Sequence, residues 1–145
     1  MAAKQVLVVD DSHEIRELLK AYLEALLDVN IVTAENSVAA IAMLQKKSPD
    51  LCAAIVDVLM LGYGGTVVDY LRSNPRYENT TIAFYTGIDR RLLDKRLTEG
   101  TQFFSKGAGE LEKVIECVRK AVSADRTPIR IPDAPAKICE AAGVS

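Results

Sequence analysis

Short apolar runs alternate along the chain with longer segments in which apolar residues recur every three or four positions. The first run, residues 6–9, reads Val-Leu-Val-Val, and such continuous β-branched runs are typical of strands buried on both faces of a parallel sheet. From Ile15 to Leu26 the apolar positions instead follow the helical period. The chain therefore opens with a predicted strand followed by a predicted amphipathic helix.

This unit of a strand and a helix recurs four more times. The pattern predicts further strands at residues 30–33, 51–56, 82–85 and 101–104. It predicts further helices at residues 37–47, 66–72, 90–98 and 110–122. Because parallel strands need crossover connections, which are right-handed, the order predicts a single α/β doubly wound domain with a five-stranded parallel sheet.

Composition fits one domain and gives no sign of a nucleic acid or a membrane as partner. The chain has 145 residues, is 49% hydrophobic and carries a net charge of −2, without a basic stripe for nucleic acid. It has neither an apolar run of membrane-spanning length nor a signal-peptide pattern at its start. We expect a cytoplasmic protein in which residues 1–124 form the domain and residues 125–145, with three of the five prolines, form a tail or linker.

Side chains that can bind ions or take part in a reaction follow the ends of the predicted strands. Asp10 and Asp11 follow the first strand, Asp57 the third and Thr86 the fourth, and Lys106 comes shortly after the fifth. Ligand sites of open α/β sheets lie beyond the carboxyl ends of the strands, so we expect these five side chains at one edge. Three clustered carboxylates repel one another and favour a divalent cation such as Mg²⁺. A carboxylate beside such an ion can attack a phosphoryl group, whose oxygens a hydroxyl and an ammonium can bind.

With these residues the sequence resembles the receiver domains of response regulators in two-component signalling. The resemblance covers about residues 4–123, and the order and spacing of its motifs together are specific to the family. The matching positions are the Asp10-Asp11 pair after a β-branched strand, Asp57 closing Ala-Ala-Ile-Val-Asp, Met60, Gly65, Thr86-Gly87 and Lys106.

The resemblance implies a flavodoxin-like (βα)5 fold with strand order 2-1-3-4-5. It also implies that Asp57 accepts a phosphoryl group from a sensor histidine kinase or a histidine phosphotransfer protein. Such a domain catalyses at most its own phosphoryl transfer and dephosphorylation, and is otherwise no enzyme. The roles that it implies are Mg²⁺ or Mn²⁺ binding by Asp10, Asp11, Asp57 and the backbone carbonyl of Leu59, phosphoryl binding by Thr86 and Lys106, and switching by Thr86 and Phe103.

The chain departs from the family pattern at several positions. Leu61 and Gly107 stand where the family usually has prolines, so we expect a trans peptide bond after Lys106. Leu59 and Ile88 are apolar where many relatives carry polar side chains that bear on the access of water to the aspartyl phosphate. Phe103 suits core packing as well as switching.

Three other functions compete with a phosphorylation switch. A pseudo-receiver would keep the fold as a protein-interaction module without phosphorylation, as Leu61 and Gly107 allow. A phosphatase of the haloacid dehalogenase kind needs a second aspartate two residues after the nucleophile, where this chain has Leu59. A flavin-binding domain needs a phosphate loop after the first strand, where Asp10 and Asp11 would repel the phosphate.

Output from a domain of this size has to pass through contacts with other protein. We expect either a downstream protein target or an output domain outside this sequence. The fourth and fifth predicted helices are amphipathic enough to support a homodimer that depends on phosphorylation.

Overall fold

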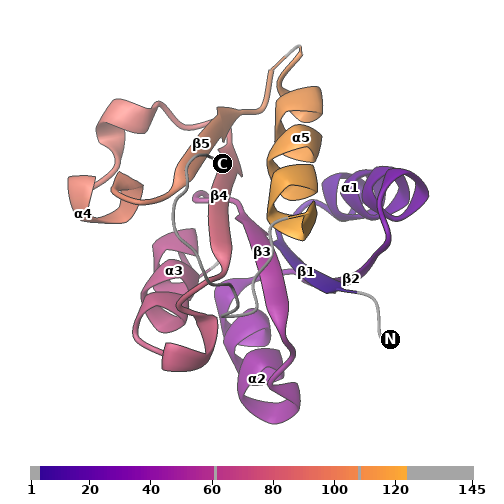
Figure 1. Ribbon diagram of the computed structural model, residues 1–145. Coiled ribbons are helices and arrows are strands. Elements are labelled where there is room, and N and C mark those ends of the chain that lie inside the picture. Colours follow the sequence, from indigo (N-terminus) through magenta and orange to yellow (C-terminus); the bar gives the residue numbers. More distant parts are fainter. Residues whose placement is uncertain (1–3, 61, 108, 124–145) are drawn as a thin grey trace, which may run out of the picture.

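The sheet has the predicted architecture. The structure, a computed structural model, describes residues 4–60, 62–107 and 109–123, so the predicted tail and Leu61 lie outside the described residues. All strand pairs are parallel, and the order β2-β1-β3-β4-β5 confirms the expected 2-1-3-4-5 arrangement (Figure 1). The strands are β1 (Lys4–Val9), β2 (Val29–Ala34), β3 (Leu51–Val56), β4 (Thr81–Thr86) and β5 (Gln102–Ser105).

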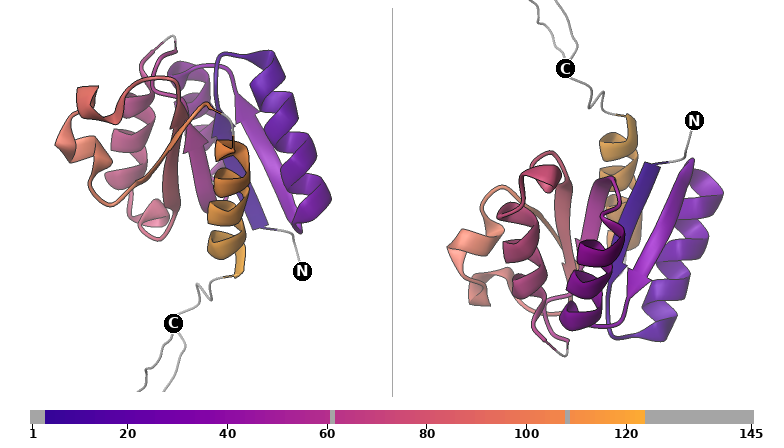
Figure 2. Two further views of the ribbon diagram at one scale, coloured as in Figure 1. Left: turned by 90° about the horizontal axis from the view of Figure 1, so that it is seen from above. Right: turned by 90° about the horizontal axis from the view of Figure 1, so that it is seen from below.

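Helices cover both faces of this sheet. Helices α1 and α5 pack on one face, and α2 and α3 pack on the other (Figure 2). The helices are α1 (His13–Leu26), α2 (Ser37–Lys47), α3 (Gly64–Arg72), α4 (Lys95–Thr98) and α5 (Glu110–Ser123). Two short 3₁₀ helices, η1 (Pro75–Tyr77) and η2 (Arg90–Leu92), complete the elements. None of the helices in the described part of the chain is both long and apolar enough to cross a membrane.

The continuous apolar runs are explained by burial on both sides of the sheet. Successive side chains of a strand point to opposite faces, and in β1 this sends Leu7 and Val9 toward α2 and α3. Val6 and Val8 pack instead with α1 and α5. All six residues of β3 are buried, so the centre of the sheet has no solvent-facing side.

The prediction of one continuous fourth helix over residues 90–98 was wrong. The segment divides into η2 and the four-residue α4, because Leu93 between them is extended, with φ −90° and ψ 146°. Asp89 accepts a hydrogen bond from the backbone N–H of Arg91, and Asp94 accepts one from that of Arg96. Two aspartate caps thus start two short helices, since a capping side chain competes with continuation of the helix. The homodimer that was expected to use this helix stays a prediction, since only the continuous helix is contradicted.

We predict that the two-sided burial of the central strands dominates stability. Replacing Leu7, which is fully buried, by alanine should lower the free energy of unfolding by about 2–5 kcal/mol, because it removes apolar contacts and leaves a cavity. Urea unfolding followed by circular dichroism measures this change. The matched control is Leu92→Ala, since Leu92 is 74% exposed, and it should change stability by less than about 0.5 kcal/mol. Equal losses in the two variants would contradict this view of the core.

Candidate functional site

Three of the predicted site residues are placed by the hydrogen-bond ladder of the sheet itself. The backbone N–H of Asp10 donates to Ala34 O at 3.1 Å, and that of Asp57 donates to Val9 O at 2.9 Å. The backbone N–H of Lys106 donates to Thr86 O, also at 2.9 Å. Each residue thus pairs with a neighbouring strand although it stands just beyond its own. The positions of these backbones follow from the sheet and not from a flexible loop.

The side chains meet as the sequence predicts. Lys106 Nζ lies 2.7 Å from Asp10 Oδ2 and 3.0 Å from Asp57 Oδ2, so one ammonium joins two carboxylates. One carboxylate oxygen each of Asp10, Asp11 and Asp57 lies within 4.8 Å of the others. Asp10 and Asp57 are buried, whereas Asp11 is exposed. The cluster is therefore open to solvent on the side of Asp11.

Burial and the neighbouring charges shift the pKa values of Asp10 and Lys106 in opposite directions. Burial raises the pKa of Asp10, although hydrogen bonds from Lys106 and from the backbone N–H of Ser12, at 2.9 Å, act to lower it. Burial also acts to lower the pKa of Lys106, but its hydrogen bonds to Asp10 and Asp57 outweigh this and leave that pKa raised. Lys106 therefore stays charged and supplies one positive charge against up to three negative ones.

Thr86 lies beside this cluster at the end of β4 and is fully buried. Its hydroxyl oxygen accepts a hydrogen bond of 3.4 Å from the backbone N–H of Ile88. Phe103 is half-buried in β5, and its ring centroid lies 6.4 Å from that of Phe84. Phe103 thus packs against the core on the α2 and α3 side, and its switching role stays a prediction.

Three departures from the family pattern fall on described residues: Gly107, Leu59 and Ile88, which is half-buried against the core. The described residues contain no cis peptide bond, as the glycine after Lys106 predicted, and Lys106 still reaches both buried carboxylates. Leu59 lies next to Asp57, with its side chain 61% exposed and its backbone N–H donating to Asp57 Oδ1 at 3.3 Å. A metal-binding role for the Leu59 carbonyl stays a prediction.

Sequence reasoning missed three residues that support the site. At Gly64, a Cβ would lie 2.0 Å from the carbonyl oxygen of Asp57, so only glycine fits behind Asp57. Arg16 donates from Nη1 to the backbone oxygen of Asp10 at 2.7 Å. The ring of Tyr85 lies under Lys106. Each contact joins two different elements, and spacing along the chain gives no signal for it.

The donor set fits a divalent cation. Carboxylate oxygens are hard ligands of the kind that Mg²⁺ and Mn²⁺ prefer, and three of them converge here. One ammonium cannot balance three ionised carboxylates, so a cation would relieve their repulsion. Because Asp11 is exposed, an ion has access to the cluster from solvent.

A comparison with protein families identifies the class of this domain. Residues 6–115 match the model of the response regulator receiver domain. The chain therefore belongs to that family, whose members are switches of two-component signalling. Among curated proteins, no sequence matches the chain significantly.

Solved structures of receiver domains share the fold. The signal receiver domain of a DNA-binding response regulator (merR) from Colwellia psychrerythraea 34H is 25% identical, with a TM-score of 0.66 over 81% of this chain and 98% of that chain. Chemotaxis protein CheY4 from Vibrio cholerae is also 25% identical, with a TM-score of 0.69 over 83% of this chain and 99% of that chain. NtrX from Brucella abortus is 21% identical, with a TM-score of 0.67 over 84% of this chain but only 28% of that chain.

We predict that the buried carboxylate of Asp10 costs stability when no metal is bound. Since burial raises the pKa of Asp10, the folded protein binds a proton there more readily than the unfolded chain. The stability that this proton provides is complete at low pH and is lost as the pH rises through the raised pKa. With a chelator present, Asp10→Asn should therefore raise the free energy of unfolding at pH 7, and the gain should shrink toward pH 4.

Urea unfolding of both proteins between pH 4 and pH 7 measures this difference. Asp28→Asn serves as the control, because Asp28 is an exposed aspartate just after α1 and its replacement should not reproduce the gain. A variant at Asp10 that is less stable than the wild type at pH 7 would contradict the prediction.

Proposed function

We propose that the chain is a phosphorylation switch in which Asp57 accepts a phosphoryl group from a sensor histidine kinase or a histidine phosphotransfer protein. Mg²⁺ or Mn²⁺ would be held by Asp10, Asp11, Asp57 and the backbone carbonyl of Leu59. The observation that carries the proposal is the bridge of Lys106 between Asp10 and Asp57, with Asp11 near enough to join them around one ion.

The chemistry follows from what each group can do. A carboxylate oxygen of Asp57 attacks the phosphorus, the bond from phosphorus to the donor nitrogen breaks, and an aspartyl phosphate results. A bound divalent cation would neutralise charge that develops on the phosphoryl oxygens. Lys106, which already lies 3.0 Å from Asp57 Oδ2, pairs with one phosphoryl oxygen, and the hydroxyl of Thr86 donates to another.

Binding of Thr86 to the phosphoryl group links the site to the surface. Thr86 ends β4, and Phe103 packs from the neighbouring strand β5 onto Phe84 of β4. We propose that phosphorylation shifts the population between two packings of these side chains and so changes the face formed by α4, β5 and α5. That face would act on a downstream protein or an output domain outside this sequence, and a phosphorylation-dependent homodimer belongs to the same proposal.

Two further assignments belong to this function. We take residues 1–124 as the receiver unit and residues 125–145 as its tail or linker. The cytoplasm is the location that a partner histidine kinase domain implies.

Helix α1, which begins beside Asp11, offers a protein donor an apolar surface, because Leu18, Tyr22 and Leu26 recur at intervals of four and are 37%, 46% and 53% exposed.

A pseudo-receiver without phosphorylation is the alternative. Its motivation was the loss of two family prolines, but the lysine that precedes one of them still contacts both buried carboxylates. This contact favours a phosphorylation switch over a pseudo-receiver.

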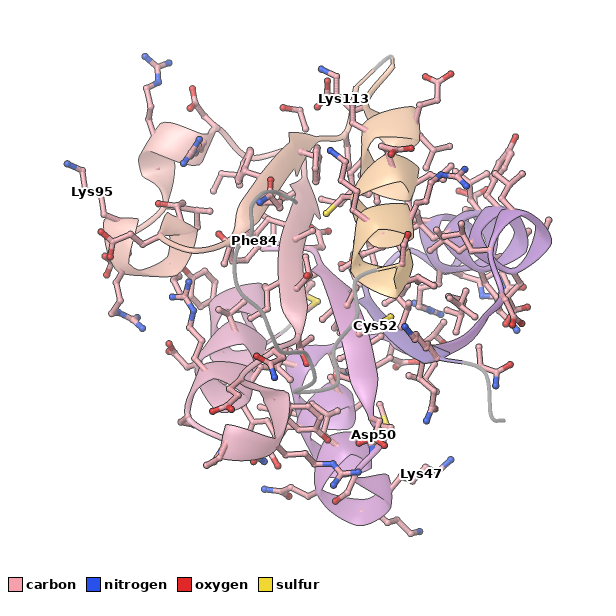
Figure 3. All side chains as sticks on the ribbon, viewed as in Figure 1. Lys47, Asp50, Cys52, Phe84, Lys95 and Lys113 are labelled. Atoms are coloured by element: carbon pink, nitrogen blue, oxygen red, sulfur yellow. The ribbon has the colours of Figure 1, made fainter. Side chains whose placement is uncertain are left out.

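The decisive experiment is incubation with acetyl phosphate and Mg²⁺, followed by intact mass spectrometry. We expect one added phosphoryl group on the wild type and none on Asp57→Asn or after chelation of the metal. The matched control is Asp50→Asn, since Asp50 lies just before the opposite end of the same strand, is almost fully exposed, and should leave labelling intact (Figure 3). A folded wild type that gains no phosphoryl group would favour the pseudo-receiver.

We also predict a slow loss of the phosphoryl group. Leu59 is exposed beside Asp57 and offers no polar atom to orient an attacking water. Leu59→Asn should therefore speed dephosphorylation by roughly twofold to tenfold, less than the 10²-fold or more of a general base, because an amide orients water without taking its proton. Decay of labelled protein after removal of acetyl phosphate measures the rate. Leu92→Asn, an equally polar change at an exposed leucine of η2, should leave the rate unchanged, and equal rates at Leu59→Asn and the wild type would contradict the prediction.

A further inference from the structure

Tyr85 lies directly beneath the ammonium of Lys106. It precedes Thr86 on β4, and its side chain points to the opposite face of the sheet, into the cluster formed with α1 and α5. Tyr85 is only 6% exposed, and Lys106 Nζ lies over its ring at 5.9 Å from the centroid. A cation within about 6 Å of the face of an aromatic ring is attracted by the negative charge of that face.

Lys106 needs a contact that orients its ammonium, because its side chain has to reach across a neighbouring strand. It follows β5, and its side chain crosses the end of β4 to reach Asp57 after β3 and Asp10 after β1. The next residue, Gly107, has no side chain to pack against the lysine, and a Cβ there would meet open space. The backbone bond to Thr86 fixes where the lysine begins but not where its ammonium points. The ring of Tyr85 lies under this path.

The charges on both partners suit this contact. Burial raises the pKa of the Tyr85 phenol, Lys106 acts to lower it, and the carboxylates of Asp10 and Glu110 act to raise it further. The net result is a neutral ring at physiological pH. The raised pKa of Lys106 keeps the ammonium charged over that ring.

We propose that Tyr85 is a positioning residue whose ring holds the Lys106 ammonium in place for the phosphoryl group on Asp57. The inference rests on the proposed function, in which Lys106 binds a phosphoryl oxygen. Tyr85 acts through Lys106 and not on the phosphoryl group itself. The ring is required and the hydroxyl is not.

The rate of Asp57 labelling by acetyl phosphate and Mg²⁺ provides the kinetic test. Tyr85→Leu should slow labelling by roughly threefold to tenfold, and Tyr85→Phe, which keeps the ring, should restore the rate. Tyr85→Met serves if the leucine variant fails to fold. The matched control is Phe104→Leu, because Phe104 is the cross-strand neighbour of Tyr85 in the same cluster, and its loss should leave the rate unchanged.

A double-mutant cycle separates positioning from general damage. In a Lys106→Ala background, Tyr85→Leu should change the rate by less than about twofold, because the group that it positions is gone. An equal slowing with and without Lys106, or a Tyr85→Leu variant as fast as the wild type, would overturn the proposal.

Nuclear magnetic resonance of ¹³C-lysine-labelled protein tests the contact without phosphorylation. The ring should shift the ε-methylene protons of Lys106 upfield in the wild type and in Tyr85→Phe, and the shift should vanish in Tyr85→Leu. If the wild type shows this shift but takes no phosphoryl group, the proposed function fails while the contact stands. If the wild type is labelled but the lysine signal is the same in Tyr85→Leu, only the role of Tyr85 is wrong.

Discussion

Repulsion among the carboxylates of Asp10, Asp11 and Asp57 is the constraint on which this structure depends. Two of the three are buried, and burial of a carboxylate is costly unless it is paired with a positive charge or hydrogen-bonded. Lys106 meets both buried groups with a single ammonium. This arrangement balances the charges only in part, and in our proposal a divalent cation and a phosphoryl group complete it.

The sheet makes such an arrangement possible. Asp10, Asp57 and Lys106 are each hydrogen-bonded to a neighbouring strand, so their backbones are as well fixed as the core. The central strands that carry the two buried carboxylates are buried on both faces, which gives the site a rigid base. By contrast, η2 and α4 are short elements, and Lys95 of α4 points away from the sheet (Figure 3). The proposed phosphorylation site thus lies at the hydrogen-bonded sheet, and the proposed signalling face includes these short elements.

Much of the fold could be predicted because burial leaves a clear pattern. Strand β3 and helix α2 have the predicted bounds, since apolar residues and a following proline mark their limits. The prediction of a single fourth helix failed because Leu93 and Leu97 have the helical spacing, whereas Asp94 lies between them and caps a second helix. Three contacts of the site could not be predicted: the close approach of Gly64 to Asp57, the hydrogen bond from Arg16 to Asp10, and the ring of Tyr85 beneath Lys106. Such contacts depend on how separate elements meet.

A crystal structure of the chain with Mg²⁺ and beryllofluoride, a mimic of the phosphoryl group, would test the central claim most directly. We predict beryllofluoride on a carboxylate oxygen of Asp57, Mg²⁺ in contact with Asp10, Asp11 and Asp57, and the Lys106 ammonium in contact with a fluorine. An ordered protein in which neither group is bound and Lys106 still bridges Asp10 and Asp57 would contradict it.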